Sequence, residues 1–279
     1  MRDAAAALAA AGIDNVRFEA RLLLAHAAGL SAEQLIARGT EPAPAGVAKT
    51  LRALAARRVG REPMAYIVGE REFWGLPFKV SPAVLVPRPD SETLIEAALV
   101  LMPDRQRPWR ILDLGLGSGC LLLALLREYP AAGGVGLELS GDALAVASAN
   151  AEALDVAGRA ELMLGDWRQP HWHERLGGPF DLIVSNPPYV EAGALGRLMP
   201  EVARFEPKLA LDGGPDGLAA YRYIATAAAA LMASSGHLLV EIGAGQALET
   251  SKIFASAGLV APVCWKDLGG IDRVISLTH

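Results

Sequence analysis

Apolar and polar positions recur with different periods along the chain, and the first part has a helical period. Before Gly60, apolar residues recur every three to four positions, which is typical of amphipathic helices. Ser31 and Gln34 have the spacing of a capping box at the start of one of them. The pattern predicts a helical bundle over residues 1–63, with helices at 4–11, 16–28, 32–37 and 47–59.

Residues 64–86 break this period. Aromatic and β-branched residues at 65–68, and again at 72–80, are interrupted by glycine and proline. This composition favours short strands and tight turns. We therefore expect a β-hairpin or an extended linker between the bundle and a second domain.

After Pro89, apolar runs typical of strands alternate with segments of helical period. Strands are predicted at 110–114, 135–139, 160–164, 181–185 and 237–242, and helices at 91–102, 120–128, 142–154, 218–233 and 246–257. This alternation implies parallel β-α-β units with helices on both faces of a sheet. The last two runs, 259–265 and 273–277, are too close for a crossover helix and predict an antiparallel hairpin.

The predicted fold is therefore α/β, with a mainly parallel, Rossmann-like sheet of about seven strands and a reversed edge strand over residues 87–279. This is the architecture of class I methyltransferases. A chain of 279 residues with 52% apolar residues can bury a large core. It lacks the ~18-residue apolar stretch of a membrane span, and its two cysteines cannot form a disulfide framework. We expect a cytoplasmic monomer without a membrane partner.

Charge is distributed unevenly along the chain. Residues 1–80 carry 11 Lys and Arg against 8 Asp and Glu, whereas residues 81–279 carry 15 against 23. Such an acidic body lacks the concentrated basic footprint of nucleic-acid-binding proteins, so no direct nucleic-acid partner is expected. The front part contains a basic cluster, formed by Arg52, Arg57, Arg58 and Arg61. Two interpretations of this cluster remain open: it docks an acidic partner, or it is a solvated helix face.

A glycine-rich turn follows the first predicted strand of the second domain. Its pattern is Gly115-x-Gly117-x-Gly119, preceded by Asp113, and not the Gly-x-Gly-x-x-Gly of dinucleotide sites. This form resembles the loop that binds S-adenosyl-L-methionine. The residues that we predict to contact this cofactor here are Asp113, Gly115, Leu116, Gly117, Ser118 and Gly119.

Two further acidic positions follow the next two strands. Glu138 is placed to accept the ribose hydroxyls, as carboxylates do in nucleotide-binding folds. Asp166 is predicted to accept the adenine amine, and Trp167 to flank the base. Together with the glycine loop, these positions fit one adenosyl ligand. No metal site is predicted, because His171 and His173 lack further residues at ligand spacing.

The strand at 181–185 ends in Asn186-Pro187-Pro188-Tyr189, the predicted catalytic segment. The two prolines stiffen the turn, which leaves the Asn186 side-chain oxygen and the Pro187 carbonyl as acceptors. Such acceptors stabilise a planar nitrogen as it becomes pyramidal and partly positive during methyl transfer. Asn186 also borders the cofactor site, and Tyr189 is predicted to pack against the flat acceptor group. The segment does not choose between glutamine, adenine and guanine.

Over nearly its whole length, the chain resembles the protein-(glutamine-N5) methyltransferases that modify peptide chain release factors, the HemK/PrmC-type family. Besides the two motifs above, the segments that carry the resemblance are 70–80, 86–92, 205–217 and 267–274. The resemblance implies a release factor as partner, with the glutamine of its Gly-Gly-Gln motif as acceptor and the helical front as docking module. Leu116 stands where the family usually has Thr, and Glu138 where Asp is common. Arg88 and Glu92 either shape the entrance of the site or form an ion pair at a helix start.

Two alternatives to glutamine methylation remain. Methylation of an exocyclic amine in DNA or RNA would use the same tetrapeptide, but it predicts strong, salt-dependent nucleic-acid binding. A non-enzymatic binding module on the translation apparatus would keep its function after loss of Asn186.

Overall fold

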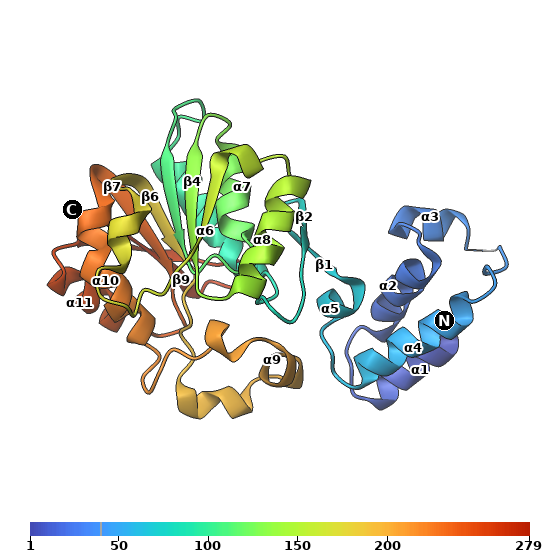
Figure 1. The fold of residues 1–279 in the computed structure, drawn as a ribbon. Coiled ribbons are helices and arrows are strands. Elements are labelled where there is room, and N and C mark those ends of the chain that lie inside the picture. Colours follow the sequence, from blue (N-terminus) through green and yellow to red (C-terminus); the bar gives the residue numbers. More distant parts are fainter. Residues whose placement is uncertain (40) are drawn as a thin grey trace. The chain divides into compact units, whose positions relative to one another are not determined.

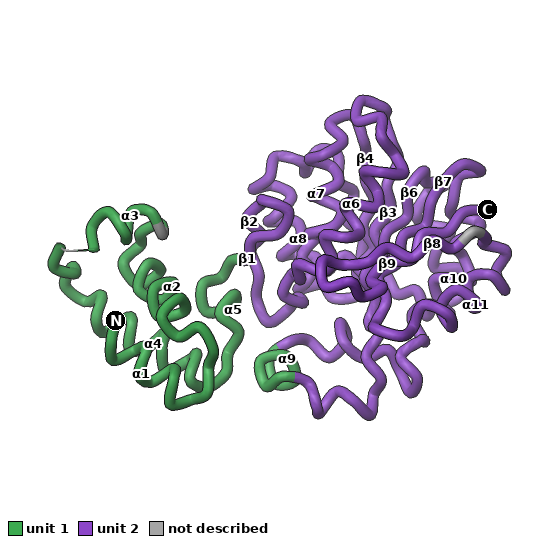
Figure 2. The backbone as a smooth tube through the Cα atoms, turned by 180° about the vertical axis from the view of Figure 1, so that it is seen from behind, with its two compact units in different colours: residues 1–70, 199–205 green, residues 71–198, 206–279 purple. Residues whose placement is uncertain are grey.

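The computed structural model describes residues 1–39 and 41–279, which separate into two compact units. The helical unit comprises residues 1–70 together with residues 199–205 from much later in the chain. The sheet unit comprises residues 71–198 and 206–279, and Figure 2 colours the two units separately. A short piece of the second half of the chain thus belongs to the front unit.

The helical unit contains the four predicted helices, close to their predicted bounds. They are α1 (Arg2–Ala10), α2 (Val16–Ala28), α3 (Ala32–Ala37) and α4 (Val47–Val59). Leu8, Leu23 and Leu51 are among the buried residues of its core. The capping box at the start of α3 is present, because the Ser31 side chain accepts from the Gln34 amide and the Gln34 side chain accepts from the Ser31 amide.

A fifth helix, α5 (Met64–Val68), replaces the extended segment expected there. Pro63 lies at its N-cap and Gly69 ends it with a φ of 84°. Proline at the start and glycine after the end are a helix signal, and here they outweigh the preference of the aromatic and β-branched residues for strands. The predicted hairpin begins only afterwards, with β1 (Glu70–Phe73) and β2 (Leu76–Lys79).

The late segment of the helical unit forms α9 (Pro200–Phe205). Its Glu201 carboxylate accepts from Arg58 at 3.0 Å and from Arg61 at 2.9 Å. Arg58 is buried and also pairs with Glu19 at 2.7 Å. Both interpretations of this basic cluster were therefore wrong for Arg58, which holds three segments of its own unit together.

The sheet unit confirms the predicted α/β fold (Figure 1). Its seven strands lie in the order β5-β4-β3-β6-β7-β9-β8. The strands are β3 (Arg110–Leu114), β4 (Gly133–Glu138), β5 (Ala160–Leu164), β6 (Phe180–Ser185), β7 (Met232–Glu241), β8 (Val260–Lys266) and β9 (Asp272–Thr278). β7 begins five residues before its predicted start, where the sequence pattern extended the preceding helix to residue 233.

The sequence predicted that the reversed strand would lie at the edge of the sheet. This prediction was wrong, because the reversed strand, β9, lies one position inside the edge. β9 runs antiparallel to both β7 and β8, so β8 at the edge points the same way as the rest of the sheet. Val274, Ile275 and Leu277 of β9 are buried, whereas Val260 and Val263 of β8 are about half exposed. The strand in the inner position therefore has its apolar residues buried, and the edge strand leaves apolar residues exposed.

Helices cover both faces of the sheet, as predicted. On one face, α6 (Glu92–Leu101), α7 (Cys120–Glu128) and α8 (Gly141–Ala153) pack in a cluster that includes Ile111 of β3. On the other, α10 (Ala219–Leu231) and α11 (Ala247–Ser256) pack in a cluster that includes Leu112 and Leu114 of the same strand. Alternate residues of β3 thus enter opposite cores.

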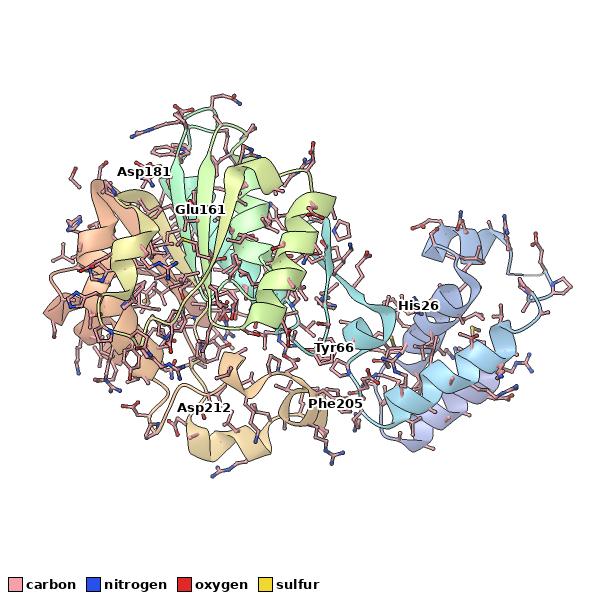
Figure 3. All side chains as sticks on the ribbon, in the orientation of Figure 1. His26, Tyr66, Glu161, Asp181, Phe205 and Asp212 are labelled. Atoms are coloured by element: carbon pink, nitrogen blue, oxygen red, sulfur yellow. The ribbon has the colours of Figure 1, made fainter. Side chains whose placement is uncertain are left out.

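Short 3-10 turns complete the connections. They are η1 (Pro89–Ser91), η2 (Ala157–Arg159), η3 (Trp172–Leu176), η4 (Ala192–Arg197) and η5 (Lys208–Ala210). Because β3, β4, β5, β6 and β7 are parallel, their carboxyl ends meet at one edge of the sheet. In Figure 3, Asp181 at the start of β6 lies at the end of the sheet opposite Asp212, which lies beyond this edge.

Candidate active site

The glycine loop connects β3 to α7 at this edge. Gly115, Gly117 and Gly119 have φ angles of 83°, 55° and 81°, a region that side chains disfavour. The Gly115 amide donates to the Leu137 carbonyl of the neighbouring strand at 3.0 Å. A Cβ on Gly115 would come within 3.1 Å of the Trp167 ring. Glycine therefore allows the loop and the ring to lie directly against each other.

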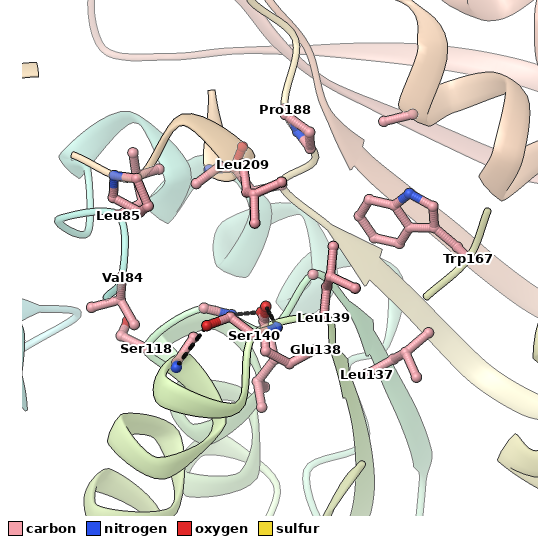
Figure 4. Close-up of a pocket in the computed structure, with 18 of the residues that line it drawn as sticks. Val84, Leu85, Ser118, Leu137, Glu138, Leu139, Ser140, Trp167, Pro188 and Leu209 are labelled. Carbon is pink, nitrogen blue, oxygen red and sulfur yellow. Dashed lines mark hydrogen bonds between the residues drawn. The ribbon is translucent and has the colours of Figure 1, made fainter. Parts of the chain in front are cut away.

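Glu138 ends β4 beside this loop. Its Oε2 accepts from the Gly117 amide at 2.8 Å, and its Oε1 accepts from the Ser140 amide at 2.8 Å (Figure 4). Each carboxylate oxygen can accept a further hydrogen bond. The carboxylate is thus held in place by backbone groups and still has acceptor capacity for ligand hydroxyls.

Asp113 lies beneath the loop and is 1% exposed. Its Oδ2 accepts from the Leu122 amide of α7 at 3.3 Å, whereas its Oδ1 has no partner among the described residues. Burial, and to a smaller extent the nearby Glu138 charge, raises the pKa of Asp113 to about 7, while the hydrogen bond from the Leu122 amide opposes the shift. An unpartnered buried oxygen is costly in the protein interior, so this one fits a donor supplied from outside the chain.

Asp166 and Trp167 follow β5 on the far side of the loop. The Asp166 carboxylate receives two hydrogen bonds from the Arg168 guanidinium at 2.8 Å, which hold the pKa of Asp166 below its usual range. Asp166 is therefore ionised and can only accept hydrogen bonds. Its role toward an adenine amine stays a prediction.

These segments surround one cavity of about 360 Å³ within the sheet unit, a size typical of small-molecule sites. Figure 4 shows Glu138, Trp167, Pro188 and Leu209 around it. The predicted site residues that line it are Gly115, Leu116, Gly117, Ser118, Glu138, Asp166, Trp167, Asn186 and Pro188. The other four do not line it: Asp113, Gly119, Pro187 and Tyr189.

The predicted catalytic tetrapeptide leaves β6 at the wall of this cavity. Asn186 lines the cavity, and its Nδ2 donates to the Ser91 hydroxyl at 3.0 Å. Its Oδ1 receives no hydrogen bond from the described residues. Pro187 is buried, and the Tyr189 hydroxyl is directed away from the cavity toward Glu241 at 3.2 Å. The amide oxygen of Asn186 is therefore a side-chain acceptor at the cavity wall, and the role of the Pro187 carbonyl stays a prediction.

Two residues that the sequence analysis missed support the tetrapeptide from behind. Glu241 ends β7, is 1% exposed, and accepts from both Ser91 and Tyr189. Gln246 donates to the Tyr189 carbonyl at 3.0 Å. The run Glu241-Ile242-Gly243-Ala244-Gly245-Gln246 follows an apolar strand at the same sheet edge. This placement was the available signal, but the residues have no spacing of their own that indicates chemistry.

The turn at 212–217 packs against the other side of the tetrapeptide. Gly214 and Gly217 have positive φ angles of 86° and 72°. A Cβ on Gly217 would lie 2.5 Å from the Tyr189 carbonyl oxygen, and one on Gly213 would lie 2.9 Å from the Pro188 carbonyl oxygen. Glycine is therefore required here for close backbone approach as well as for conformation.

Comparison with known proteins decides the family. Residues 1–69 match the family model "PrmC N-terminal domain", and residues 91–203 match "Methyltransferase small domain". The chain is 46% identical to the release factor glutamine methyltransferase of Cereibacter sphaeroides, covering 99% of this chain and 96% of the relative. It is 44% identical to the protein of the same name from Rhodospirillum rubrum, covering 96% and 80%. The chain belongs to the release factor glutamine methyltransferase family.

Solved structures agree on the fold. The catalytic domain of hMettl16 superposes with a TM-score of 0.58 at 14% identity, over 81% of each chain. A methyltransferase from Pyrococcus furiosus gives 0.52 at 16% identity, over 80% of this chain and 95% of the other. At these identities the likeness supports the class I methyltransferase fold and not a shared substrate.

The cofactor implied by membership in a methyltransferase family is S-adenosyl-L-methionine, and the cavity fits it. A Cβ on Gly117 would meet no atom within 4 Å, so the glycine loop leaves open space at this point of the cavity wall. Glu138 and Asp166 provide carboxylate acceptors, Trp167 provides a flat apolar surface, and Asp113 retains an unpartnered oxygen. The hydroxyls, amines and flat base of an adenosyl ligand match these acceptors and this flat surface.

Leu116 and Glu138, the two residues that depart from the family pattern, have different surroundings. The Leu116 side chain is buried and packs over Gly136 of β4, where a Cβ would come within 2.7 Å of it. The larger residue is thus accommodated by a glycine on the neighbouring strand. Glu138 keeps the carboxylate that the family motif places there. Relative to the residues usual in the family, Leu116 lacks a hydroxyl, whereas Glu138 retains a carboxylate.

Arg88 and Glu92 do not form an ion pair with each other. Arg88 lines the cavity and pairs with the buried Glu206 at 2.6 Å, whereas Glu92 accepts from the Trp74 amide at 2.9 Å. Burial raises the pKa of Glu206, and Arg88 opposes this shift. The sequence left two alternatives open, a place at the entrance of the site or an ion pair at a helix start. Arg88 lies at the cavity wall, in agreement with the first.

Among the helices of residues 1–39 and 41–279, none combines the length and apolar character that crossing a membrane requires. Within the same residues, no three His, Cys, Asp or Glu side chains gather where they could hold a metal ion.

Proposed function

We propose that this protein transfers a methyl group from S-adenosyl-L-methionine to the side-chain amide nitrogen, N5, of the glutamine in the Gly-Gly-Gln motif of peptide chain release factors. Family membership supports the reaction and the class of partner. The single observation that carries the chemistry is the hydrogen bond from Asn186 Nδ2 to Ser91. It leaves the amide oxygen of Asn186, at the cavity wall, to accept from the substrate.

An amide nitrogen is a poor nucleophile because its lone pair is delocalised into the carbonyl group. The N–H groups become better donors as the nitrogen turns pyramidal and gains positive charge. Asn186 Oδ1 and the Pro187 carbonyl are fixed acceptors that would bind the nitrogen more tightly in the transition state than in the ground state. The two prolines keep these acceptors in place without reorganisation.

S-adenosyl-L-methionine, when bound, supplies a methyl group on a positively charged sulfur. The residues that we propose to hold it are those of the glycine loop, Glu138, Asp166, Trp167 and Asp113. Their task is to bind and orient the ligand so that the acceptor nitrogen meets the methyl group in line. No base is needed before transfer, because the methylated amide can release its proton afterwards.

A release factor is a large partner, and we propose that the helical unit contributes to docking it. A cytoplasmic location, a monomeric state and the absence of direct nucleic-acid binding stay predictions from the sequence. Gel filtration and nucleic-acid binding at low salt test the last two.

The proposed function is tested by incubating the protein with methyl-labelled S-adenosyl-L-methionine and a release factor. The matched control is the same release factor with alanine in place of the glutamine of its Gly-Gly-Gln motif. We expect label on the glutamine-containing factor only. Equal labelling of both factors, or preferential labelling of DNA or RNA, would contradict the proposal.

A further inference from the structure

A chain of three side chains links the buried Glu241 to the cavity. The Ser91 hydroxyl donates to Glu241 Oε2 at 2.5 Å, and Asn186 Nδ2 donates to the Ser91 oxygen at 3.0 Å. Ser91 is 2% exposed and Glu241 is 1% exposed, so water does not compete for these hydrogen bonds. The second carboxylate oxygen, Oε1, accepts from the Tyr189 hydroxyl.

The hydrogen bonds that link Asn186, Ser91 and Glu241 can run in one direction only. An ionised carboxylate can only accept hydrogen bonds, so the single hydroxyl hydrogen of Ser91 must be donated to Glu241. Ser91 then has only lone pairs to offer Asn186, which must turn its NH2 group toward Ser91. The Asn186 oxygen is thereby left for the cavity.

We infer that Glu241 is a positioning residue that sets the orientation of the Asn186 amide, acting through Ser91, so that an oxygen and not an NH2 group meets the acceptor nitrogen. The inference rests on the proposed function, because an orientation of Asn186 matters only for a substrate that donates N–H groups. The acceptor character of Asn186 is thus imposed by a residue 55 positions later in the chain, outside the tetrapeptide.

Replacement of Glu241 by glutamine would reverse this direction. The amide of a glutamine has one oxygen and one NH2 group, and the buried Tyr189 hydroxyl needs an acceptor. With its oxygen on Tyr189, the new side chain offers NH2 to Ser91. Ser91 then donates to the Asn186 oxygen, and Asn186 turns its NH2 group into the cavity, where it repels the N–H groups of the substrate.

The charged and titratable groups around Glu241 come from four elements and from the segment after β6. They are Asp90 of η1, Cys120 of α7, Tyr189 after β6, Tyr221 of α10 and Arg273 of β9. Arg273 is itself paired with Asp90 and Asp267. Burial raises the pKa of Glu241 to about 7, while Ser91 and Arg273 oppose the shift. Protonation of Glu241 makes it a donor and, like the glutamine variant, releases Ser91 from its fixed direction.

The test is a double-mutant cycle in the release-factor assay, with Glu241→Gln, Ser91→Ala and the combined variant. We expect Glu241→Gln to lower kcat on the order of 100-fold, as for the loss of a transition-state dipole. In Ser91→Ala the orientation of the Asn186 amide is no longer fixed, but nothing turns its NH2 group toward the cavity. We therefore expect kcat to fall by about 10-fold. Because reversal requires the Ser91 hydroxyl, the combined variant is expected to be about 10-fold faster than Glu241→Gln alone.

Two further readouts separate positioning from a structural role. KM for the release factor and the dissociation constant of S-adenosyl-L-methionine should change little in all three variants. The wild-type kcat should fall as the pH decreases through about 7, and this acidic limb should be absent in Glu241→Gln and Ser91→Ala. Glu128→Gln is the matched control, because Glu128 also accepts from two side chains, Trp74 and Arg105, outside the cavity. Its kcat should equal that of the wild type.

A combined variant at least as slow as Glu241→Gln, with the wild type active on the glutamine-containing factor, would overturn the inference and leave the proposed function intact. An unchanged kcat in Glu241→Gln would do the same. If Glu241→Gln does not fold, an unaltered acidic limb in Ser91→Ala overturns the inference and a missing limb supports it. A wild type that labels the glutamine and alanine factors equally overturns both.

Discussion

Two buried carboxylates lie at one edge of the sheet, and they differ in how their oxygens are used. Asp113 and Glu241 are each 1% exposed, and burial raises the pKa of each to about 7. Among the residues that the structure describes, Asp113 has an oxygen without a partner, whereas both oxygens of Glu241 accept hydrogen bonds from side chains. The first therefore retains acceptor capacity for a ligand, whereas the second acts only through its neighbours.

The comparison therefore divides the site into a cofactor end and an acceptor end. Changes at the cofactor end should alter affinity for S-adenosyl-L-methionine, and changes at the acceptor end should alter the rate of transfer.

The largest effect is expected for Asn186, the residue that we propose to contact the acceptor. Asn186→Ala should lower kcat by at least ~100-fold, with a much smaller change in cofactor affinity. Single-turnover kinetics and calorimetric titration measure the two; retained chemistry would refute the role of Asn186.

The turn behind the tetrapeptide gives the next effect. In Gly217→Ala the new Cβ would lie 2.5 Å from the Tyr189 carbonyl oxygen at a φ of 72°. We expect a loss of stability on the order of 1–3 kcal/mol, measured by denaturant unfolding, together with slower transfer. Gly245→Ala is the control, because it has a φ of 82° but meets no atom within 4 Å. Equal losses in both variants would show that conformation, and not close approach, requires Gly217.

At the cofactor end, Asp113→Asn removes the charge but nearly keeps the shape. We expect affinity for S-adenosyl-L-methionine to fall by about 10-fold, the effect of one charge-assisted hydrogen bond, with kcat at saturating cofactor nearly unchanged. Calorimetric titration at pH 8 measures the dissociation constant. A variant with normal affinity and reduced kcat would remove the distinction between the two carboxylates.

The last expected effect concerns how stability depends on pH. The pKa of Glu241 rises from 4.5 in the unfolded chain to about 7 in the folded protein. As pH rises from about 4.5 to about 7, the unfolded chain releases this proton while the folded protein retains it, so the folded state loses stability. Glu241→Gln lacks this titration. Its Tm should therefore gain on that of the wild type between pH 5 and pH 7.5; a constant difference in Tm would contradict the shift.

The two ends also differ in how well their residues could be predicted from the sequence. The cofactor end consists of local motifs that follow one another along the chain: a strand, three glycines and a helix, and then an acidic residue at or just after the end of each of the next two strands. Parallel strands bring such positions to one edge, so the sequence predicts their proximity. The tetrapeptide is equally local. Nine of the thirteen predicted residues line the cavity, although their roles stay predictions.

The support behind the tetrapeptide is not local and was not predicted. Ser91 and Glu241 are 150 positions apart and meet only through the sheet. A serine before a helix is usually a cap, and a glutamate at a strand end is usually solvated, so neither residue type indicates burial. The same holds for α9, whose Glu201 joins Arg58 from 143 positions away. Pairings of this kind depend on the tertiary fold, whereas hydrophobic period reports only on local structure.

The most direct test is a structure of the protein with a release factor and S-adenosyl-L-homocysteine. The account predicts the Asn186 oxygen and the Pro187 carbonyl within about 3 Å of the glutamine side-chain nitrogen, with the Asn186 NH2 group still on Ser91. A complex in which the glutamine nitrogen lies beyond reach of both oxygens would contradict the account.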